Sequence, residues 1–330
     1  MYSQSRPAPS GDRCLPAPGT RAAGSPTARR SATASAGRRR LTSERGWPHT
    51  PIGCESALKC CPTTRPNVPS RLDERRNLAN VTEEAWRPPL HITPDTRLHR
   101  SLSAVRRCFD LQAASIWRDL SGELPGVSGL VLDVGCGAQP YRQLIGSSSD
   151  YLGIDTVNAR PDFGYELPDT IYFEGGTWPV ADGSVDVVLC TETLEHVLEP
   201  ATLLDEAHRS LRPGGRLILT VPFAARWHFI PHDYWRYTPS GLYNLLRAAG
   251  FREVCVYARG NAGTVACYKL MALALPFLLP SSGGVRARLL QLLALLTLPF
   301  VFALALIGRA TLHGKGGDDC LGYTATALRP

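Results

Sequence analysis

The first seventy residues of this 330-residue chain lack almost everything that a folded core needs. They contain two aromatic residues, Tyr2 and Trp47, and only 3 acidic residues against 11 Lys and Arg. A segment this polar cannot bury enough apolar surface to offset the entropy of ordering it. We therefore predict that residues 1–75 form a disordered basic tail without a catalytic role.

The N-terminus also lacks the apolar stretch of a secretory signal. Its composition, rich in Arg and Ser and poor in acids, is shared by transit peptides and disordered chains, and we favour disorder or a start codon placed too early. Beyond residue 70, 25 basic and 26 acidic residues remain, so the net charge of +7 belongs to the tail. The folded part therefore gives no reason to expect a nucleic-acid partner.

The chain has ten cysteines, but none lies in a Cys-x-x-Cys pair and no zinc-type ligand spacing is present. This absence argues against a structural zinc site. Buried free thiols in a reducing compartment are the favoured interpretation.

Short apolar runs and helical patterns alternate along the middle of the chain. The apolar runs predict strands at 129–134, 151–155, 171–173, 185–190, 216–221, 253–258 and 322–328. The helical spacing predicts helices at 97–120, 140–145, 200–211 and 239–249. Unbroken apolar strands joined by helices indicate an α/β fold, in which a doubly wound, mostly parallel seven-stranded sheet is covered on both faces.

The turn after the first strand contains Gly135 and Gly137. A β-carbon at either position would hold a ligand away from the main-chain amides at the carboxyl edge of the sheet, where such folds bind ligands. Pro140 stands where the dinucleotide fingerprint has its third glycine, which argues against a nicotinamide cofactor. Asp155 closes the next strand, 18 residues after Gly137, and can accept hydrogen bonds from ribose hydroxyls. Each feature alone fits an ordinary turn, but together they predict an adenosine-type ligand.

Three segments resemble motifs of class I S-adenosylmethionine-dependent methyltransferases of the methyltransferase type 11 kind. They are VLDVGCG at 131–137, DGSVDVVLCTETLEHV at 182–197 and LRPGGRLILTVP at 211–222. They stand in the order and spacing of the family, and the resemblance covers roughly residues 100–260 and 318–328. It implies a Rossmann-like methyltransferase fold and S-adenosyl-L-methionine as the cofactor.

The resemblance also implies roles for individual residues at the cofactor site. The methionine part would be held by Asp133 and by the backbone of Gly135, Cys136 and Gly137, the ribose by Asp155, and the adenine near Thr177 and Trp178. Glu192 would line the boundary between cofactor and substrate. In the segment EGGT at 174–177, glycine and threonine stand where the family carries its acid after the third strand, so a relative that has lost catalysis is an alternative.

The segment 227–238 packs two histidines, an acid, an arginine and five aromatic residues into twelve positions after the fifth strand. Its resemblance to segments of methyltransferases acting near cell-envelope sugars and lipids suggests a lid over the acceptor. We predict His232 as the base or acceptor-orienting group, fixed by Asp233 or Arg236, with His228 as the second choice. The alternative is a core aromatic pair beside a surface ion pair between Asp233 and Arg236.

Two other combinations near this segment are weaker predictions. His228 and His232 are spaced as metal ligands but lack a clear third ligand, so we expect no metal. Glu195 and His196 form an acid–base pair, but Glu195 equally suits the start of a helix. The pair also occurs in relatives with many acceptor types, so it does not identify a chemistry.

Residues 263–312 interrupt the alternation with two apolar helical arms. The arm at 289–308 is long enough to span a bilayer, at ~1.5 Å per residue against a core of ~30 Å. In the resembling family the flanking strands are antiparallel neighbours, so an odd number of crossings is excluded. Arg286 and Arg288 in the connection would be costly to carry across, so we predict a shallow or re-entrant hairpin at the cytoplasmic face of a membrane. The alternatives are a pair of helices lying in the membrane interface and a soluble helical subdomain or oligomer interface.

These observations predict a methyltransferase domain at 76–262, an apolar helical hairpin at 263–312 and a final strand of that domain within 313–330. The predicted function is transfer of a methyl group from S-adenosylmethionine to a small molecule, with a saccharide or lipid-linked intermediate near the membrane as the candidate acceptor. The alternatives are a membrane-tethered binding protein without catalysis and, third, an NAD-dependent oxidoreductase.

Overall fold

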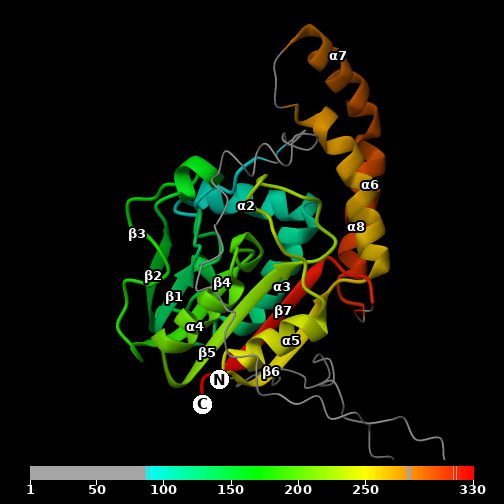
Figure 1. The fold of residues 1–330 in the computed structure, drawn as a ribbon. Helices are drawn as coiled ribbons and strands as arrows, with labels where there is room; N and C mark the ends of the chain where they lie inside the picture. Colours follow the sequence, from blue (N-terminus) through cyan, green and yellow to red (C-terminus); the bar gives the residue numbers. More distant parts are fainter. Residues whose placement is uncertain (1–86, 88, 281–283, 315, 317) are drawn as a thin grey trace, which may run out of the picture. The chain divides into compact units, whose positions relative to one another are not determined.

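The computed structural model describes residues 87, 89–280, 284–314, 316 and 318–330 (Figure 1). The predicted basic tail at 1–75 lies outside the described residues. The described residues contain one seven-stranded sheet with the order β3-β2-β1-β4-β5-β7-β6. Its strands are β1 (Gly129–Val134), β2 (Ser149–Thr156), β3 (Thr170–Phe173), β4 (Val185–Thr191), β5 (Leu211–Pro222), β6 (Arg252–Arg259) and β7 (Gly322–Leu328).

The last strand is the one that breaks the parallel pattern. The neighbours from β3 through β5 pair in parallel, whereas β7 pairs antiparallel with both β5 and β6. The predicted doubly wound, mostly parallel sheet is therefore confirmed, and so is the antiparallel pairing of the two strands that flank the insertion. Because β6 is antiparallel to β7, it runs in the same direction as β5 and ends at the same edge of the sheet.

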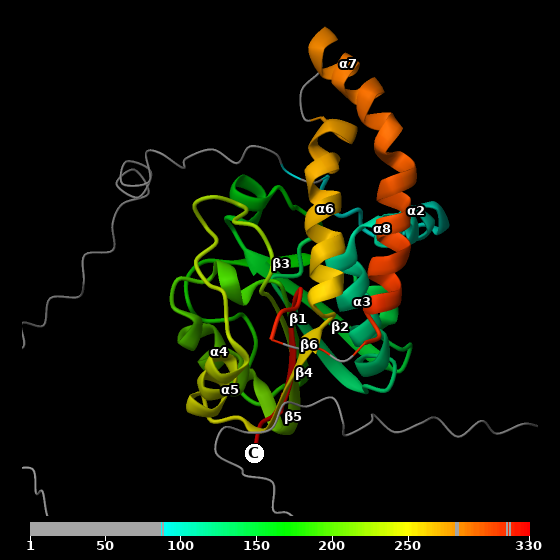
Figure 2. The same ribbon diagram turned by 90° about the vertical axis from the view of Figure 1, so that its right-hand side faces the viewer.

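Helices cover the two faces of this sheet (Figure 2). One face is covered by α3 (Leu111–Glu123) and the other by α4 (Pro200–Ser210) and α5 (Pro239–Ala248). Helix α2 (Arg97–Phe109) packs beside α3, and the insertion adds α6 (Ala262–Leu278), α7 (Val285–Ala294) and α8 (Leu298–Thr311). The helical pattern predicted at 97–120 is broken at Asp110, whose backbone is extended and whose side chain caps α3 through the Ala113 amide. The helix predicted at 140–145 is a single 3-10 turn, Arg142–Leu144.

Alternate residues along the strands build two separate layers of core. Val131, Leu189 and Ile218 pack with Ile116 and Leu120 of α3. The intervening strand residues, such as Leu132, Val188 and Leu217, pack on the opposite face with Leu204 of α4 and Leu242 of α5. This two-sided burial explains why the strands read as unbroken apolar runs in the sequence.

The insertion forms a helical hairpin in which α6 leads away from β6 and α7 and α8 return to β7 (Figures 1 and 2). Its base packs on α3, where a β-carbon on Gly308 would lie 2.5 Å from Leu111 Cδ1. Its far end is exposed and apolar, as Leu273, Val285 and Leu296 illustrate. The helical run Val285–Thr311 is long and apolar enough to cross a membrane, and 22% of its most apolar window is buried.

Candidate active site

The turn after β1 adopts a backbone conformation that its glycines permit. Gly135 and Gly137 have φ angles of 68° and 49°, in the left-handed region. The amides of Gly135 and Cys136 donate to the Ile154 carbonyl on β2, which fixes the turn against the neighbouring strand. A β-carbon on Gly135 would lie 2.4 Å from the Thr193 side chain, so the turn lies directly against the segment that follows β4.

Asp155 lies at the tip of β2 and meets this glycine turn. Its carboxylate accepts hydrogen bonds from the Gly137 amide at 3.1 Å and the Thr156 amide at 2.8 Å. Burial raises the pKa of Asp155, against these two hydrogen bonds, which lower it. The acid predicted to bind a ribose therefore stands beside the glycine turn predicted to face the same ligand.

Asp133 is buried beneath the turn, with one carboxylate oxygen accepting from the Tyr151 hydroxyl at 2.8 Å. Its other oxygen, Oδ1, has no hydrogen-bond partner. Burial raises the pKa of Asp133 to about 7, against the Tyr151 hydrogen bond, which lowers it. An unpartnered carboxylate oxygen behind a glycine turn suits a cationic ligand group. The neighbouring Cys136 has a buried thiol beside the Thr170 hydroxyl, so its backbone, and not its side chain, faces the turn.

Thr177 and Trp178 lie after β3 and differ in exposure. Thr177 is exposed, whereas the Trp178 indole belongs to the core, with its backbone amide donating to Glu206 Oε2 at 2.7 Å. The Trp178 ring is therefore occupied in packing. A position near an adenine stays a prediction, with Thr177 the more accessible of the two.

Glu192 follows β4 in the left-handed region, at φ 49°. Its Oε1 accepts a hydrogen bond at 2.7 Å from Arg259, which is fully buried at the end of β6. Arg259 also donates to Ser115 Oγ and to the Val221 carbonyl, so it joins three elements at this edge. Arg259 was not among the residues predicted from the sequence; its signal was a charged residue that ends an apolar strand at the carboxyl edge of the sheet.

Within the segment 227–238, Asp233 is the central group. Its side chain is fully buried and accepts two hydrogen bonds from Arg236, at 2.5 and 2.6 Å. Its Oδ2 also accepts from the His228 backbone amide and lies 3.0 Å from His228 Nδ1. Burial raises the pKa of Asp233, but the hydrogen bonds from Arg236 and His228 lower it well below its ordinary value. The alternative of a surface ion pair is wrong, because this pair lies inside the segment.

His232, the first choice for a base, has other neighbours than those predicted. Its Nδ1 lies 3.4 Å from the Tyr234 hydroxyl and its Nε2 lies 3.7 Å from Asp162 Oδ1. Asp233 contacts His228 instead, so the prediction that Asp233 fixes His232 is wrong. The reason is backbone geometry, since the turn from 228 to 233 directs the carboxylate back to the His228 amide. Tyr237 is a core residue, while the Trp235 ring is 41% exposed.

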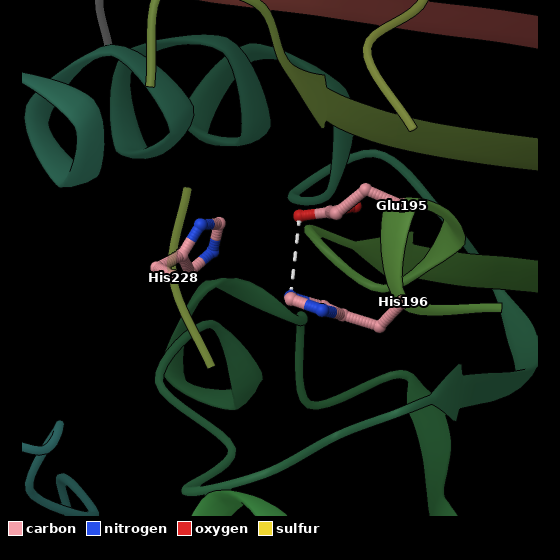
Figure 3. A group of neighbouring side chains, drawn as sticks. All are labelled: Glu195, His196 and His228. Atoms are coloured by element: carbon pink, nitrogen blue, oxygen red, sulfur yellow. Dashed lines mark ion pairs between the residues drawn. The ribbon is translucent and has the colours of Figure 1, made fainter. Parts of the chain in front are cut away.

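Figure 3 shows a cluster that the sequence analysis had set aside: Glu195, His196 and His228. Glu195 is fully buried in the 3-10 turn Leu194–His196, and neither of its carboxylate oxygens has a hydrogen-bond partner. His196 Nε2 lies 3.7 Å from Glu195 Oε1, and the rings of His196 and His228 meet edge to face at 5.1 Å. Burial raises the pKa of Glu195 and lowers that of His196 to about 4, which keeps the imidazole neutral.

These groups share one edge of the sheet. The glycine turn follows β1, Asp155 is the second-last residue of β2, residues 192–196 follow β4 and residues 227–238 follow β5. Because these four strands are parallel, their carboxyl ends lie together. The contact of Gly135 with Thr193 joins the glycine turn to the Glu195–His196 turn. His228 joins that turn to the segment 227–238, hereafter the covering segment.

Comparisons with known proteins agree on one family. A family model described as a methyltransferase domain matches residues 109–256. A ubiquinone biosynthesis O-methyltransferase from Cereibacter sphaeroides is 30% identical over 204 residues, which cover 53% of this chain and 80% of that protein. An uncharacterized 37.1 kDa transposon protein from Streptomyces fradiae is 34% identical over 134 residues, and the chain spans only 36% of its length.

Among solved structures, the chain resembles an S-adenosylmethionine-dependent methyltransferase from Thermotoga maritima described as a possible histamine N-methyltransferase. The two share 15% sequence identity with a TM-score of 0.42, and the match covers 70% of this chain and 97% of that one.

Proposed function

Because the chain belongs to the class I S-adenosylmethionine-dependent methyltransferases, we propose that it methylates a small molecule that reaches the site from a membrane surface. The acceptor class we propose is a saccharide or lipid-linked intermediate at the cytoplasmic face of that membrane. Membership of this family sets aside the nicotinamide-dependent oxidoreductase considered from the sequence.

The residues at the glycine turn fit the proposed cofactor. The unpartnered Asp133 Oδ1 can receive the ammonium of the methionine part, and the open backbone at Gly135 and Gly137 admits its chain. Asp155 can exchange the Gly137 amide for ribose hydroxyls. S-adenosylmethionine, when bound, supplies a methyl group on a positively charged sulfur. The chain has to align the acceptor with that methyl group, and alignment alone can contribute on the order of 7–11 kcal/mol.

The covering segment and the 192–196 turn form the acceptor side in this proposal. Glu192, oriented by the buried Arg259, lies where the two ligands would meet. His228, held by Asp233, and His232, beside Tyr234, are the candidate bases in this proposal. A base among them would be required only if the acceptor must lose a proton, and it would contribute roughly 10²–10⁴-fold.

We propose a membrane contact because the hairpin is attached to the edge of the sheet at which the candidate active site lies. Strand β6 ends at Arg259, which pairs with Glu192, and α6 begins three residues later at Ala262. Sixteen large apolar side chains are exposed along the hairpin, from Leu270 to Ile307. An exposed apolar surface of this kind marks an interaction site, and here it would bring lipid next to the acceptor side.

The path of the chain supports a shallow insertion of the hairpin into the bilayer. Strand β7 is docked between β5 and β6, so α6 and the return helices must leave and re-enter on the same side. The exposed Arg286 and Arg288 lie at the far end of the hairpin, where they can reach anionic headgroups without crossing the hydrocarbon. Crossing completely would place both charges across the membrane at a high cost.

The test combines vesicle binding with identification of the product. The purified full-length chain is floated with vesicles of phosphatidylcholine and phosphatidylglycerol, and methyl-labelled S-adenosylmethionine is then supplied with a bacterial membrane extract or an aqueous metabolite extract. We expect flotation with the vesicles and label in the solvent-extracted lipid fraction. Label confined to water-soluble products, with no flotation, would contradict the membrane acceptor.

A matched pair of variants distinguishes membrane binding through the hairpin from nonspecific binding to vesicles. Leu293→Glu introduces a charge at an apolar position of the hairpin that is 63% exposed, and it should reduce the floated fraction at least severalfold. Leu98→Glu changes a leucine on α2 that is 66% exposed and should leave flotation unchanged. Equal loss in both variants would show that the hairpin is not the membrane contact.

A further inference from the structure

The Glu195 carboxylate lies inside the protein without a hydrogen-bond partner. Its side chain is fully buried, and both oxygens lack a hydrogen-bond partner. Buried carboxylates are normally paired, hydrogen-bonded or bound to metal, because the interior does not replace the water that solvates an unpaired charge. The groups that face it include the imidazoles of His196 and His228 (Figure 3), while the Arg236 guanidinium acts on it electrostatically without a hydrogen bond.

Both histidines are oriented through the same ring nitrogen. His196 Nδ1 lies 2.5 Å from the His232 carbonyl, which can only accept, so Nδ1 carries the proton. His228 Nδ1 lies 3.0 Å from both Asp233 Oδ2 and the Arg226 carbonyl, which sets the same tautomer. Each ring therefore keeps a lone pair on Nε2. Fixing a histidine through one nitrogen by a carboxylate or a carbonyl is the arrangement that accompanies metal-binding histidines.

One ligand atom from each of Glu195, His196 and His228 lies within 4.8 Å of the other two. We propose that these three side chains bind a divalent first-row metal ion such as Zn²⁺ or Mn²⁺. Ligands at ~2.1 Å from one ion lie about 3.0–3.4 Å apart, so the site closes by roughly an ångström on binding. His228 lies in the covering segment and is the ligand placed to move.

The ligand set leaves coordination positions open. Two imidazoles and one carboxylate occupy three positions, as in catalytic metal sites that keep a place for water or substrate. The ion lies between the 3-10 turn after β4 and the covering segment, on the acceptor side of Glu192. It is therefore placed to hold an oxygen of the acceptor.

The role of the ion, but not its binding, rests on the proposed methyl transfer. An acceptor hydroxyl on the ion would have a lowered pKa and release its proton to solvent. Its oxygen electron pair then forms the bond to the methyl carbon, while the carbon–sulfur electron pair returns to sulfur and leaves a neutral thioether. One proton and one positive charge on sulfur are lost together, so the step balances without an added oxidant or reductant.

The experiment measures metal binding directly. The full-length chain, stripped with EDTA, is titrated with Zn²⁺ by calorimetry and with Mn²⁺ by electron paramagnetic resonance. We expect one equivalent to bind, and His228→Asn to weaken binding at least ~100-fold, because a three-ligand site loses one ligand. The same loss is expected for Glu195→Gln, with thermal unfolding of the metal-free variants showing that both fold.

Two further variants decide between a built site and adventitious binding. Asp233→Asn, which touches His228 and not the ion, should cost roughly 10–100-fold in metal affinity. His313→Asn removes an exposed histidine outside the cluster and should change nothing. Absence of stoichiometric binding, or equal affinity in His228→Asn and the parent chain, overturns the site. Binding of S-adenosylmethionine to the metal-free chain is measured in parallel, so failure of the proposed function is seen separately.

Discussion

The two sides of the site are built in different ways. On the cofactor side, the turn after β1 is held by backbone amides, and its side-chain contacts join residues 18 apart, such as Gly137 with Asp155 and Asp133 with Tyr151. On the acceptor side, two of the contacts join groups that are much farther apart in sequence. His196 reaches a carbonyl 36 residues away, and Arg259 reaches a carboxylate 67 residues away.

The two sides therefore tolerate different substitutions. A backbone cradle depends on φ angles that only glycine adopts without strain, so it fails when a side chain is added. A network of buried side chains depends on every member being paired, so it fails when one charge is removed. Variants that damage one side and spare the other therefore test the division.

The largest effect is expected for Gly135→Val. Valine at φ 68° is strained, and its β-carbon would lie 2.4 Å from Thr193. Strain and overpacking together amount to about 3 kcal/mol, so we expect affinity for S-adenosylmethionine to fall at least ~10²-fold in calorimetric titration.

Gly214→Val is the matched control, because Gly214 also has a positive φ, 77°, but no atom lies near its β-carbon position. It carries the backbone strain without the steric conflict at the site. Equal loss of cofactor affinity in both variants would mean that the turn after β1 has been assigned the wrong role.

The second effect is expected for Asp233→Asn on the acceptor side. Removing this carboxylate leaves Arg236 and His228 without their shared partner, which should cost about 2 kcal/mol of stability once the partial exposure of Arg236 is allowed for. Cofactor affinity should change less than about twofold, since none of these groups touches the glycine turn. Thermal unfolding and calorimetry measure the two quantities.

Asp182→Asn is a control for this variant, because Asp182 also pairs with an arginine, Arg209, but is 78% exposed. Surface pairs contribute roughly 0–1 kcal/mol, so its unfolding temperature should barely move. A similar loss in both variants would show that the burial of Asp233 has no energetic consequence.

The cofactor side was largely predictable from the sequence. Strands buried on both faces appear as unbroken apolar runs, and the glycines mark the turn where the chain must approach a ligand. Asp155 could be placed because strand length and parallel order bring the tip of β2 beside the turn. Trp178 was misleading, since an aromatic residue near a ligand site and one in the core look alike in sequence.

The acceptor side was predictable in location but not in pairing. The density of polar and aromatic residues at 227–238 identified the segment, yet the partner of Asp233 depends on how the backbone turns between 228 and 233. Glu195 resembled a helix-start residue because local sequence does not report burial. Its unpartnered carboxylate follows from residues 33 positions away folding over it, which no local pattern encodes.

The third effect concerns Arg259, the positioning residue between the two sides. Arg259→Lys keeps the charge but cannot reach Glu192, Ser115 and the Val221 carbonyl together. Lost charge-assisted hydrogen bonds should cost about 1.5–2 kcal/mol, and kcat should fall while KM for S-adenosylmethionine stays constant. Arg209→Lys, at a similarly bonded arginine far from the site, should lower stability but leave kcat unchanged.

The smallest effect is a pH dependence confined to the cofactor side. In the free protein Asp133 has a pKa raised to about 7, mainly by burial, so its proton is bound below that pH and released above it. An ammonium group favours the charged carboxylate, so binding must expel this proton at low pH. Affinity for S-adenosylmethionine should therefore be full above pH 7 and fall about tenfold per unit below it, in titrations from pH 8 to 5.5. Asp133→Asn should bind weakly with no such slope, and a slope that survives in this variant would place the titrating group elsewhere.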